Sequence, residues 1–329
     1  MPAEWEPHEA TWLSWPKDPA TFPAGILEKV EQIYLKMIEE LSLGERVDLL
    51  VEDLRTEERI SSRLKSSKNV VFHRMHSVDV WMRDYAPIFV KNGSVAATKW
   101  IFNAWGNKYD DLLLDNQSGM MVANLAGKKI FEPGIVLEGG SIDVNGLGTC
   151  LTTQQCLLNR NRNPQLSKLQ IEEKLHDFLR VTNMIWLGSG VAGDDTDGHV
   201  DDVARFVSAN TVVCMSEQNP EDENYAALTS NLEMLQHSTD QDGAPLKVVS
   251  IPMPRKVETP EGRLPASYAN FYIANAVVLV PIFNDPNDSK VIDVLRQYFP
   301  GRKIVGIECS PLVYGFGGIH CITQQQPAT

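Results

Sequence analysis

Cys321 lies just after a glycine-rich turn near the C-terminus, and its thiol makes it a candidate nucleophile. Gly315–Gly318 allows the backbone to bend and approach a ligand closely, so the following cysteine can stand at the mouth of a cavity. The competing interpretation is a small buried hydrophobe, the usual fate of a free cysteine. Neighbours in an extended segment point to opposite faces, so we expect His320 to orient structure and the base to come from elsewhere.

A second polar segment, residues 193–202, carries an imidazole and a carboxylate two positions apart. If the segment is extended, His199 and Asp201 share one face and enter the same pocket. An acidic run of this kind is more commonly a solvated loop. Both of its flanks are apolar, at residues 185–187 and 203–207, which favours a site between buried strands.

Two further acids interrupt apolar stretches. Asp84 follows Arg83 and is either part of a buried ion pair or turn cap, or a carboxylate that holds a cation, with Trp81 as a wall. Glu138 ends an apolar run before two glycines. It either caps a turn or orients the imidazole of His199, as the acid of a catalytic triad does.

Taken together, these side chains suit the hydrolysis of a guanidinium group. The cation is planar and delocalised, and two carboxylates such as Asp84 and Asp201 can fix it in bidentate fashion. The Cys321 thiolate can then attack the central carbon. A free thiol has a pKa near ~8.5, so a bound cation or an imidazolium is needed to favour the thiolate. His199 would protonate the departing ammonia and activate water to hydrolyse the covalent adduct.

The segments that must position these residues alternate between helix and strand, which indicates an α/β architecture. The predicted helices span residues 26–41, 54–66, 165–179, 224–237 and 289–299, and the predicted strands span residues 47–52, 69–75, 130–138, 149–153, 211–216, 246–252, 271–283 and 303–308. No low-complexity linker interrupts them, so we expect one domain over residues 1–329.

The polar segments recur along the chain at similar intervals. Asp84, Glu138, His199, Asn270 and Cys321 are separated by 54, 61, 71 and 51 residues. Five similar α/β units around an axis would bring five strand ends to one centre. The alternative, polar loops that simply recur between strands, fits the spacing equally well.

Composition narrows the class of protein. There are 30 Lys and Arg residues against 43 Asp and Glu, a net charge of −13, which argues against nucleic acid and anionic membranes and is compatible with cationic small molecules. The N-terminus lacks a basic and apolar leader, and no apolar run is long enough to span a membrane. The cysteine count is odd, at five, and no CxxC occurs, so we expect neither disulfides nor a zinc knuckle, and a cytoplasmic location.

In combination, these residues resemble the agmatine deiminase family, also described as bacterial peptidyl-arginine-deiminase-like. The resemblance runs from the first residues to the last ten and rests on residues 1–9, 12–16, 81–84, 138–141, 198–201, 269–273 and 318–325. It implies a pentein fold, a five-bladed α/β propeller with fivefold pseudosymmetry. It also implies hydrolysis of agmatine to N-carbamoylputrescine and ammonia without metal or cofactor.

By position, the resemblance also assigns roles to residues. It makes Cys321 the nucleophile, His199 the general acid/base and Glu138 the acid beside it. It makes Asp84 and Asp201 the guanidinium-binding pair and Trp81 a pocket wall, and it brings Asp195 to the distal amine of agmatine. The chain departs from the family at Gly318, where an Asn is usual, and at Tyr85–Pro87, where Thr-Gly-Pro is frequent; both changes concern the shape of the pocket.

Several alternatives stay open at this stage. The substrate can be free arginine, a peptidyl arginine or another alkylguanidine. A metal-binding protein would use His199, Asp201, His320 and Cys321 as ligands. A guanidine-binding protein without turnover would use the same pocket. The sequence is compatible with a homo-oligomer and does not define one.

Overall fold

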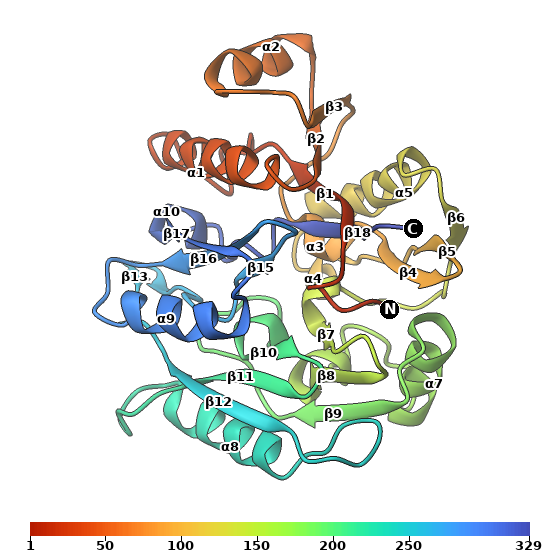
Figure 1. Cartoon of the computed structure of the whole chain (residues 1–329), viewed down its shortest axis with the longest axis vertical. Coiled ribbons are helices and arrows are strands. Elements are labelled where there is room, and N and C mark those ends of the chain that lie inside the picture. Colours follow the sequence, from red (N-terminus) through yellow and green to blue (C-terminus); the bar gives the residue numbers. More distant parts are fainter.

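Five small sheets surround a central axis in the computed structural model, which describes residues 1–329 (Figure 1). The sheets comprise β18 (Gln324–Pro327), β1 (His8–Ser14), β2 (Arg46–Val51) and β3 (Val70–Arg74); β4 (Ile88–Asn92), β5 (Ser94–Thr98) and β6 (Lys129–Phe131); β7 (Ile142–Val144), β8 (Thr149–Thr153) and β9 (Asn183–Leu187); β10 (Ala204–Ser208), β11 (Thr211–Ser216) and β12 (Lys247–Pro252); and β15 (Tyr272–Ile273), β16 (Val277–Ile282) and β17 (Lys303–Glu308). A separate hairpin joins β13 (Glu258–Thr259) to β14 (Gly262–Arg263).

The five sheets share one connectivity. In each, the first strand is antiparallel to the second, and the second is parallel to the third. One sheet takes its first strand, β18, from the far end of the chain. This strand pairs antiparallel with β1, with Trp12 opposite Gln324. β1 is in turn parallel to β2. The ring is therefore closed by the two ends of the chain. The α/β propeller with fivefold pseudosymmetry is confirmed.

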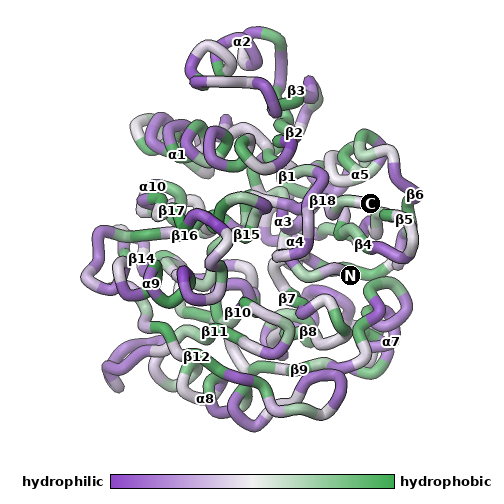
Figure 2. The backbone as a smooth tube through the Cα atoms, viewed as in Figure 1, coloured by the Kyte–Doolittle hydropathy of each residue, from purple (hydrophilic) through white to green (hydrophobic).

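A parallel pair needs a crossover, and a helix supplies it on the outer side of each sheet (Figure 1). The crossover helices are α1 (Ile26–Leu41), α5 (Asp115–Leu125), α7 (Lys168–Leu179), α8 (Tyr225–Gln236) and α9 (Asp288–Tyr298), and α2 (Leu54–Arg63) leads to the additional strand β3. In α1, Val30, Tyr34, Met37 and Leu41 form a buried stripe at helical spacing. Figure 2 shows the consequence, with purple and green alternating along α1 and green prevailing along β11 and β12.

Most predicted elements agree with the structure to within a few residues, and the helix over residues 26–41 and the strand over residues 303–308 agree at both ends. The strand predicted over residues 130–138 is wrong beyond Phe131: the chain leaves β6 there and makes only an isolated bridge at Val136. Pro133 and Gly134 interrupt the strand, and Gly134 has a φ of 76°.

The recurring polar segments occupy equivalent places in the fold. Each lies immediately before the first, innermost strand of a sheet: Asp84 before β4, Glu138 before β7, His199 before β10, Asn270 before β15 and Cys321 before β18. Asp84 lies in the short helix α3 (Met82–Tyr85). Glu138 and His199 directly precede the 3₁₀ turns η2 (Gly139–Ser141) and η3 (Val200–Asp202). The spacing in the sequence therefore reflects five inter-sheet connections that meet at the axis.

Buried charged side chains join these connections, and Glu4 in the N-terminal segment is the residue that they share. Glu4 lies on the axis, with its carboxylate 3.0 Å from Arg205 Nη2, 3.5 Å from Arg83 Nη2 and 2.8 Å from His320 Nε2. Its Oε1 also accepts a hydrogen bond from the backbone N–H of Ile273 at 2.8 Å. Four sheets thus meet at one carboxylate.

None of the helices combines the length and the apolar character that a membrane crossing requires. The five cysteines are all buried and unpaired.

We expect Glu4→Ala to destabilise the fold strongly. The substitution leaves Arg83 buried without a carboxylate and Arg205 with Asp143 alone, and breaking a buried pair costs about 3–5 kcal/mol. Urea unfolding followed by circular dichroism measures the loss. The control is Asp293→Ala, whose partner Arg296 is 59% exposed and whose removal is expected to change stability by less than about 0.5 kcal/mol. Equal losses in the two variants would contradict the axial role of Glu4.

Candidate active site

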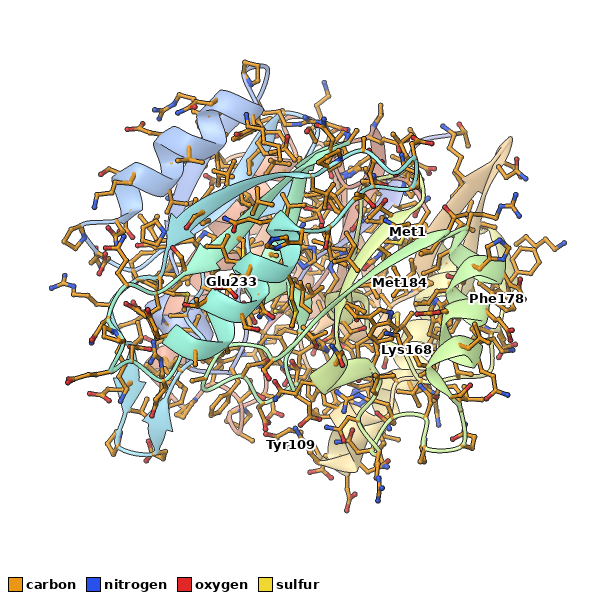
Figure 3. The ribbon with its side chains drawn as sticks, turned by 90° about the horizontal axis from the view of Figure 1, so that it is seen from below. Met1, Tyr109, Lys168, Phe178, Met184 and Glu233 are labelled. Atoms are coloured by element: carbon orange, nitrogen blue, oxygen red, sulfur yellow. The ribbon has the colours of Figure 1, made fainter.

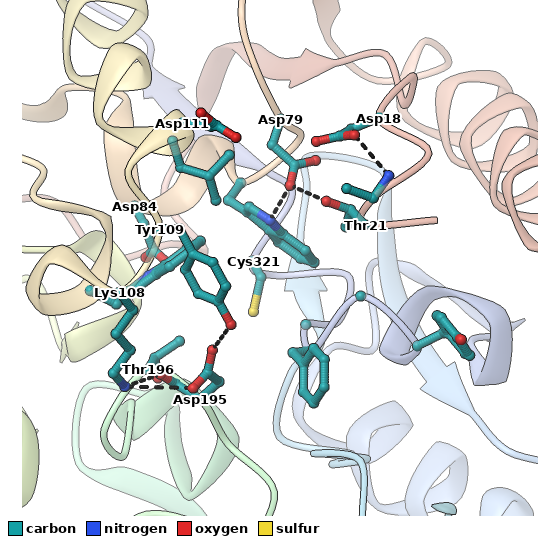
Figure 4. Close-up of a pocket in the computed structure, with 18 of the residues that line it drawn as sticks. Asp18, Thr21, Asp79, Asp84, Lys108, Tyr109, Asp111, Asp195, Thr196 and Cys321 are labelled. Carbon is teal, nitrogen blue, oxygen red and sulfur yellow. Dashed lines mark hydrogen bonds and ion pairs between the residues drawn. The ribbon is translucent and has the colours of Figure 1, made fainter. Parts of the chain in front are cut away.

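A cavity of about 560 Å³ opens beside the axis and contains Cys321 (Figure 4). Trp81 and Asp84 line it with Cys321, as the sequence predicts. Figure 3 places Tyr109, which also lines the cavity, towards one face of the molecule and Met1 nearer the other. The cavity therefore opens away from the N-terminal segment. Its ionisable lining is acidic except for Lys108, and the acids are Asp18, Asp79, Asp84, Asp110, Asp111, Asp195 and Glu261.

Cys321 is fixed by a neighbouring connection. The side-chain amide of Asn270 donates to its Sγ at 3.2 Å, and the Asn270 oxygen accepts from the backbone N–H groups of His320 and Cys321 at 2.8 and 3.3 Å. The nearest carboxylate oxygen, Asp201 Oδ2, lies 3.9 Å from Sγ. Burial raises the pKa of the Cys321 thiol well above its ordinary value, and the charges of Asp201 and Asp202 raise it further. Both effects favour the protonated thiol.

Three reactive side chains converge at Gly140. A methyl group at this glycine would lie 2.5 Å from His199 Nδ1, 3.0 Å from Asp84 Oδ1 and 3.1 Å from Asp201 Oδ2. Any side chain here would displace the two carboxylates and the imidazole, so the glycine is required for their close approach. The Gly140 N–H also donates to Asp84 Oδ1 at 3.0 Å. The structure brings His199 and Asp201 together as predicted, but through a 3₁₀ turn and not an extended segment, and neither side chain is among those that line the cavity.

His320 contributes more than the sequence suggested. The prediction that His320 orients structure is confirmed, although residues 319–322 form a turn and not the extended segment that was expected. His320 Nδ1 lies 2.6 Å from Asp201 Oδ2, while its Nε2 is bound to Glu4. Burial favours a raised pKa for Asp201, but the bond to His320 outweighs it and lowers the pKa. Asp201 is thus held as a carboxylate, with Oδ1 free of any partner.

Asp84 is held by Trp105, whose indole Nε1 donates to Asp84 Oδ2 at 2.9 Å. Trp105 belongs to α4 (Ala104–Asn107), where Ala104, Trp105 and Asn107 have φ of 50°, 53° and 60°. Three left-handed residues other than glycine are costly and mark a turn that its surroundings enforce. Burial raises the pKa of Asp84 to about 6, against the lowering effect of His199.

Glu138 is held by Arg162, whose Nε donates to Glu138 Oε1 at 2.6 Å. Glu138 Oε2 has no partner. The predicted bond that orients His199 is absent, although one oxygen of Glu138 lies within 4.8 Å of the imidazole and of Cys156. Arg162 also donates to Asp197 at 2.7 Å, so its charge is balanced twice.

His199 is the reactive group without a hydrogen bond to either ring nitrogen. Its closest charged neighbour is Asp84, with 3.8 Å between Nδ1 and Oδ1. Burial favours a lower pKa for His199, but the Asp84 carboxylate outweighs it and raises the pKa well above its ordinary value. A buried imidazolium with free N–H groups is suited to proton donation.

Asp195 lines the cavity beside Tyr109 and Lys108 (Figure 4). The Tyr109 hydroxyl donates to its carboxylate, and Lys108 Nζ lies 3.6 Å from Oδ1. Its side chain is 35% exposed. Asp195 therefore shares the cavity with Cys321, Asp84 and Trp81, and Lys108 partly neutralises it.

The two departures from the family pattern lie behind the cavity wall. A side chain at Gly318 would overlap the Asn270 oxygen that binds the backbone of His320 and Cys321. Tyr85 is fully buried, and its hydroxyl donates to the backbone oxygen of Asp79.

The metal site considered from the sequence is not assembled. Both ring nitrogens of His320 are already bound, to Asp201 and Glu4. The donor groups that do gather are Glu138, Cys156 and His199, and separately Asp201, Asp202 and Cys321.

Sequence reasoning missed the residues that hold the reactive groups. Trp105, Arg162, Glu4 and Asp202 were not singled out, and Asn270 was noted only for its spacing. Nothing in the spacing marks them, since each contacts its partner across a gap in the chain, for example 21 residues from Asp84 to Trp105 and 24 from Glu138 to Arg162. The available signal was a Trp among small and amide residues at 103–106 and two arginines between asparagines at 159–163.

Known proteins resemble this chain along its whole length. The profile of the Porphyromonas-type peptidyl-arginine deiminase family matches residues 1–327. A protein of Legionella pneumophila strain Paris named "Putative agmatine deiminase" is 38% identical over 99% of this chain and 95% of its own length.

Two solved structures share the fold along the whole chain. The agmatine deiminase of Enterococcus faecalis, described as catalysing its reaction, has a TM-score of 0.90 and 34% identity over 99% of this chain and 95% of that one. A cysteine-to-serine variant of the C. jejuni agmatine deiminase with substrate bound has a TM-score of 0.89 and 34% identity, covering 100% and 96%.

We expect iodoacetamide to modify Cys321 before the four other cysteines, because it alone of the five lines the cavity. The thiolate is the reactive form, so a raised pKa predicts slow alkylation at pH 7 that accelerates up to and beyond pH 9. Peptide mass spectrometry at a series of pH values measures the rate. A rate that levels off below pH 8 would contradict the raised pKa.

Proposed function

The chain belongs to the Porphyromonas-type peptidyl-arginine deiminase family, and we propose that it hydrolyses agmatine to N-carbamoylputrescine and ammonia. The observation that carries the proposal is the convergence of Asp84, Asp201 and His199 at Gly140, with Cys321 Sγ 3.9 Å from Asp201 in an acidic cavity. These groups match the charge of a guanidinium ion and supply a nucleophile and a proton donor.

Binding of the guanidinium group begins with the two aspartates. Asp201 is ionised, with Oδ1 free, and its carboxylate meets that of Asp84 at Gly140 through Asp201 Oδ2 and Asp84 Oδ1. Each carboxylate can accept N–H groups from one edge of the planar cation, a charge-assisted and geometrically specific contact. Trp105 and His320 keep the carboxylates in place, and Trp81 lies against the cavity as an apolar wall.

The bound cation also activates the thiol. In the empty site, burial and the surrounding carboxylates keep the Cys321 thiol protonated. A guanidinium between Asp84 and Asp201 neutralises these charges, which removes part of the cause of the raised pKa. Asn270 Nδ2, 3.2 Å from Sγ, donates to the thiolate. The nucleophile is therefore generated when the substrate is present.

The first half of the reaction forms a covalent adduct. The Cys321 thiolate attacks the guanidinium carbon and gives a tetrahedral species with a new C–S bond. His199 gives its proton to one nitrogen, the C–N bond breaks, and ammonia leaves. The amidino group remains on sulfur.

Water completes the turnover. His199, now neutral, takes a proton from water, and the hydroxide attacks the amidino carbon. The C–S bond breaks with return of its electrons to sulfur, the hydroxyl proton of the adduct passes to the Cys321 sulfur, and the product carries a carbonyl in place of the departed nitrogen. The carboxylate of Glu138, one oxygen of which lies within 4.8 Å of the imidazole, stabilises the imidazolium.

Acidity at the cavity mouth favours agmatine over free arginine. Asp18, Asp111 and Glu261 line the cavity, and a carboxylate on the substrate would meet them with repulsion, whereas the distal ammonium of agmatine would not. Asp195 belongs to this ring of charges, and we propose it as one partner of the distal amine despite Lys108 beside it. Peptidyl arginine and other alkylguanidines are the alternatives.

The proposal also covers the cellular location and the alternative of binding without turnover. We place the protein in the reducing cytoplasm, in keeping with five unpaired cysteines. A guanidine-binding protein without turnover is disfavoured because a nucleophile and a proton donor both stand at the cation site.

Agmatine is expected to release one ammonia and one N-carbamoylputrescine per turnover, and Cys321→Ala to abolish this reaction while leaving the fold intact. Ammonia assay and mass spectrometry of the product test both statements. The matched control is Cys214→Ala, a buried thiol in β11 away from the cavity, which should stay active. Activity in Cys321→Ala would refute the nucleophile. A higher kcat/KM on arginine or peptidyl arginine would refute the substrate.

The pH dependence of kcat/KM reports the free enzyme. The pKa of Asp84 is raised to about 6, so its carboxylate is charged above this pH and becomes neutral below it. We therefore expect kcat/KM for agmatine to fall as pH decreases through about 6, by roughly tenfold per pH unit if one proton is involved. Asp84→Asn should remove this acid limb along with most activity. An acid limb centred near pH 4 would contradict the raised pKa.

A further inference from the structure

A second group of donors lies behind the catalytic imidazole. Glu138, Cys156 and His199 each offer one ligand atom, and these three atoms lie within 4.8 Å of one another. They come from three places in the chain: the residue before η2, the helix α6 (Gln154–Leu157), and the residue before η3. Cys156 has no part in the proposed reaction.

The donors are fully enclosed and available. Glu138 and Cys156 are 0% exposed and His199 is 1% exposed. Glu138 Oε2 and both ring nitrogens of His199 lack any hydrogen-bond partner. Buried polar atoms are almost always paired, so unpaired atoms on adjacent side chains indicate a place for a ligand.

One thiol, one imidazole and one carboxylate are the donors that Zn²⁺ accepts, at about 2.0–2.3 Å, in sites that keep a fourth position open. Small rotations bring ligand atoms at this separation to such distances. Arg162 holds the other oxygen of Glu138, which orients the free one. Asp197 balances the charge of Arg162.

We propose that Glu138, Cys156 and His199 form an inhibitory site for Zn²⁺. The metal replaces the thiol proton of Cys156 and a proton of His199, so the imidazole can neither protonate ammonia nor accept a proton from water. The inhibition rests on the proposed function of His199, whereas the binding itself does not. The reaction requires no metal, and a chelator restores activity.

The second group, Asp201, Asp202 and Cys321, is the poorer zinc site. Asp201 Oδ2 is bound to His320, and Asp202 Oδ1 accepts from Asn270. It also contains no imidazole. Zinc at the first group requires Cys156, whereas zinc at the second group requires Cys321. Substituting each cysteine in turn therefore tests directly which group binds the metal.

Equilibrium dialysis of chelator-treated protein against buffered Zn²⁺, followed by elemental analysis, measures binding without any assay of activity. We expect one Zn²⁺ per wild-type chain, one per chain in Cys321→Ser, and affinity reduced by at least about tenfold in Cys156→Ser and Cys156→Ala. Cys150→Ser, a buried thiol in β8, is the matched control and should bind as wild type. Circular dichroism of each variant verifies the fold.

Cobalt provides a spectroscopic readout at the same site. Co²⁺ bound to the wild type and to Cys321→Ser should show a thiolate charge-transfer band that Cys156→Ser lacks. Zn²⁺ should also suppress ammonia release in the wild type, reversibly with a chelator, and should suppress the residual activity of Cys156→Ser only at higher concentration.

The outcomes separate the two proposals. Zinc lost in Cys321→Ser but retained in Cys156→Ser would move the metal to the aspartate group and overturn the inference, and so would the absence of stoichiometric zinc in the wild type. Zinc bound through Cys156 in a protein that does not turn over agmatine would support the metal site and refute the proposed function.

Discussion

The carboxylate of Glu4 is the point on which this propeller depends. Five sheets arranged around an axis leave a narrow centre, where the inter-sheet connections place arginines, a histidine and backbone N–H groups. Glu4 satisfies Arg83, Arg205, His320 and the backbone of Ile273 together. Burial favours a neutral Glu4, but these cations outweigh it and lower its pKa. The buried Glu4 carboxylate is therefore stabilised in its charged form by these partners together.

The same carboxylate links stability to chemistry. Glu4 holds His320, and His320 holds Asp201 as an ionised carboxylate beside Cys321. The closure of the ring by β18 and β1 brings the two ends of this relay together, because Glu4 precedes β1 and His320 precedes β18. A change at Glu4 therefore reaches Cys321, the proposed nucleophile, through three contacts.

Each reactive group at the axis, except one, is held by a residue from elsewhere in the chain. Trp105 holds Asp84, Arg162 holds Glu138, and Asn270 holds Cys321. His199 alone keeps its ring nitrogens free. This difference matches their tasks, since groups that bind must stay in place while the group that transfers protons needs open positions. The same free nitrogens of His199 allow the metal ion that we propose to bind together with Cys156 and Glu138.

The sequence by itself determined the architecture and the reactive residues. Helical and strand periodicity located most of the elements, and polar interruptions of apolar runs marked Asp84, Glu138, His199 and Cys321, because a charged or nucleophilic side chain among buried strands needs a reason to be there. Only the tertiary structure decided how these groups are held and charged. Glu4, Trp105 and Arg162 act across gaps that no local pattern records. Burial, a property of the assembled fold, raises the pKa of Asp84 and Cys321, and a turn where a strand was expected brings His320 onto Asp201.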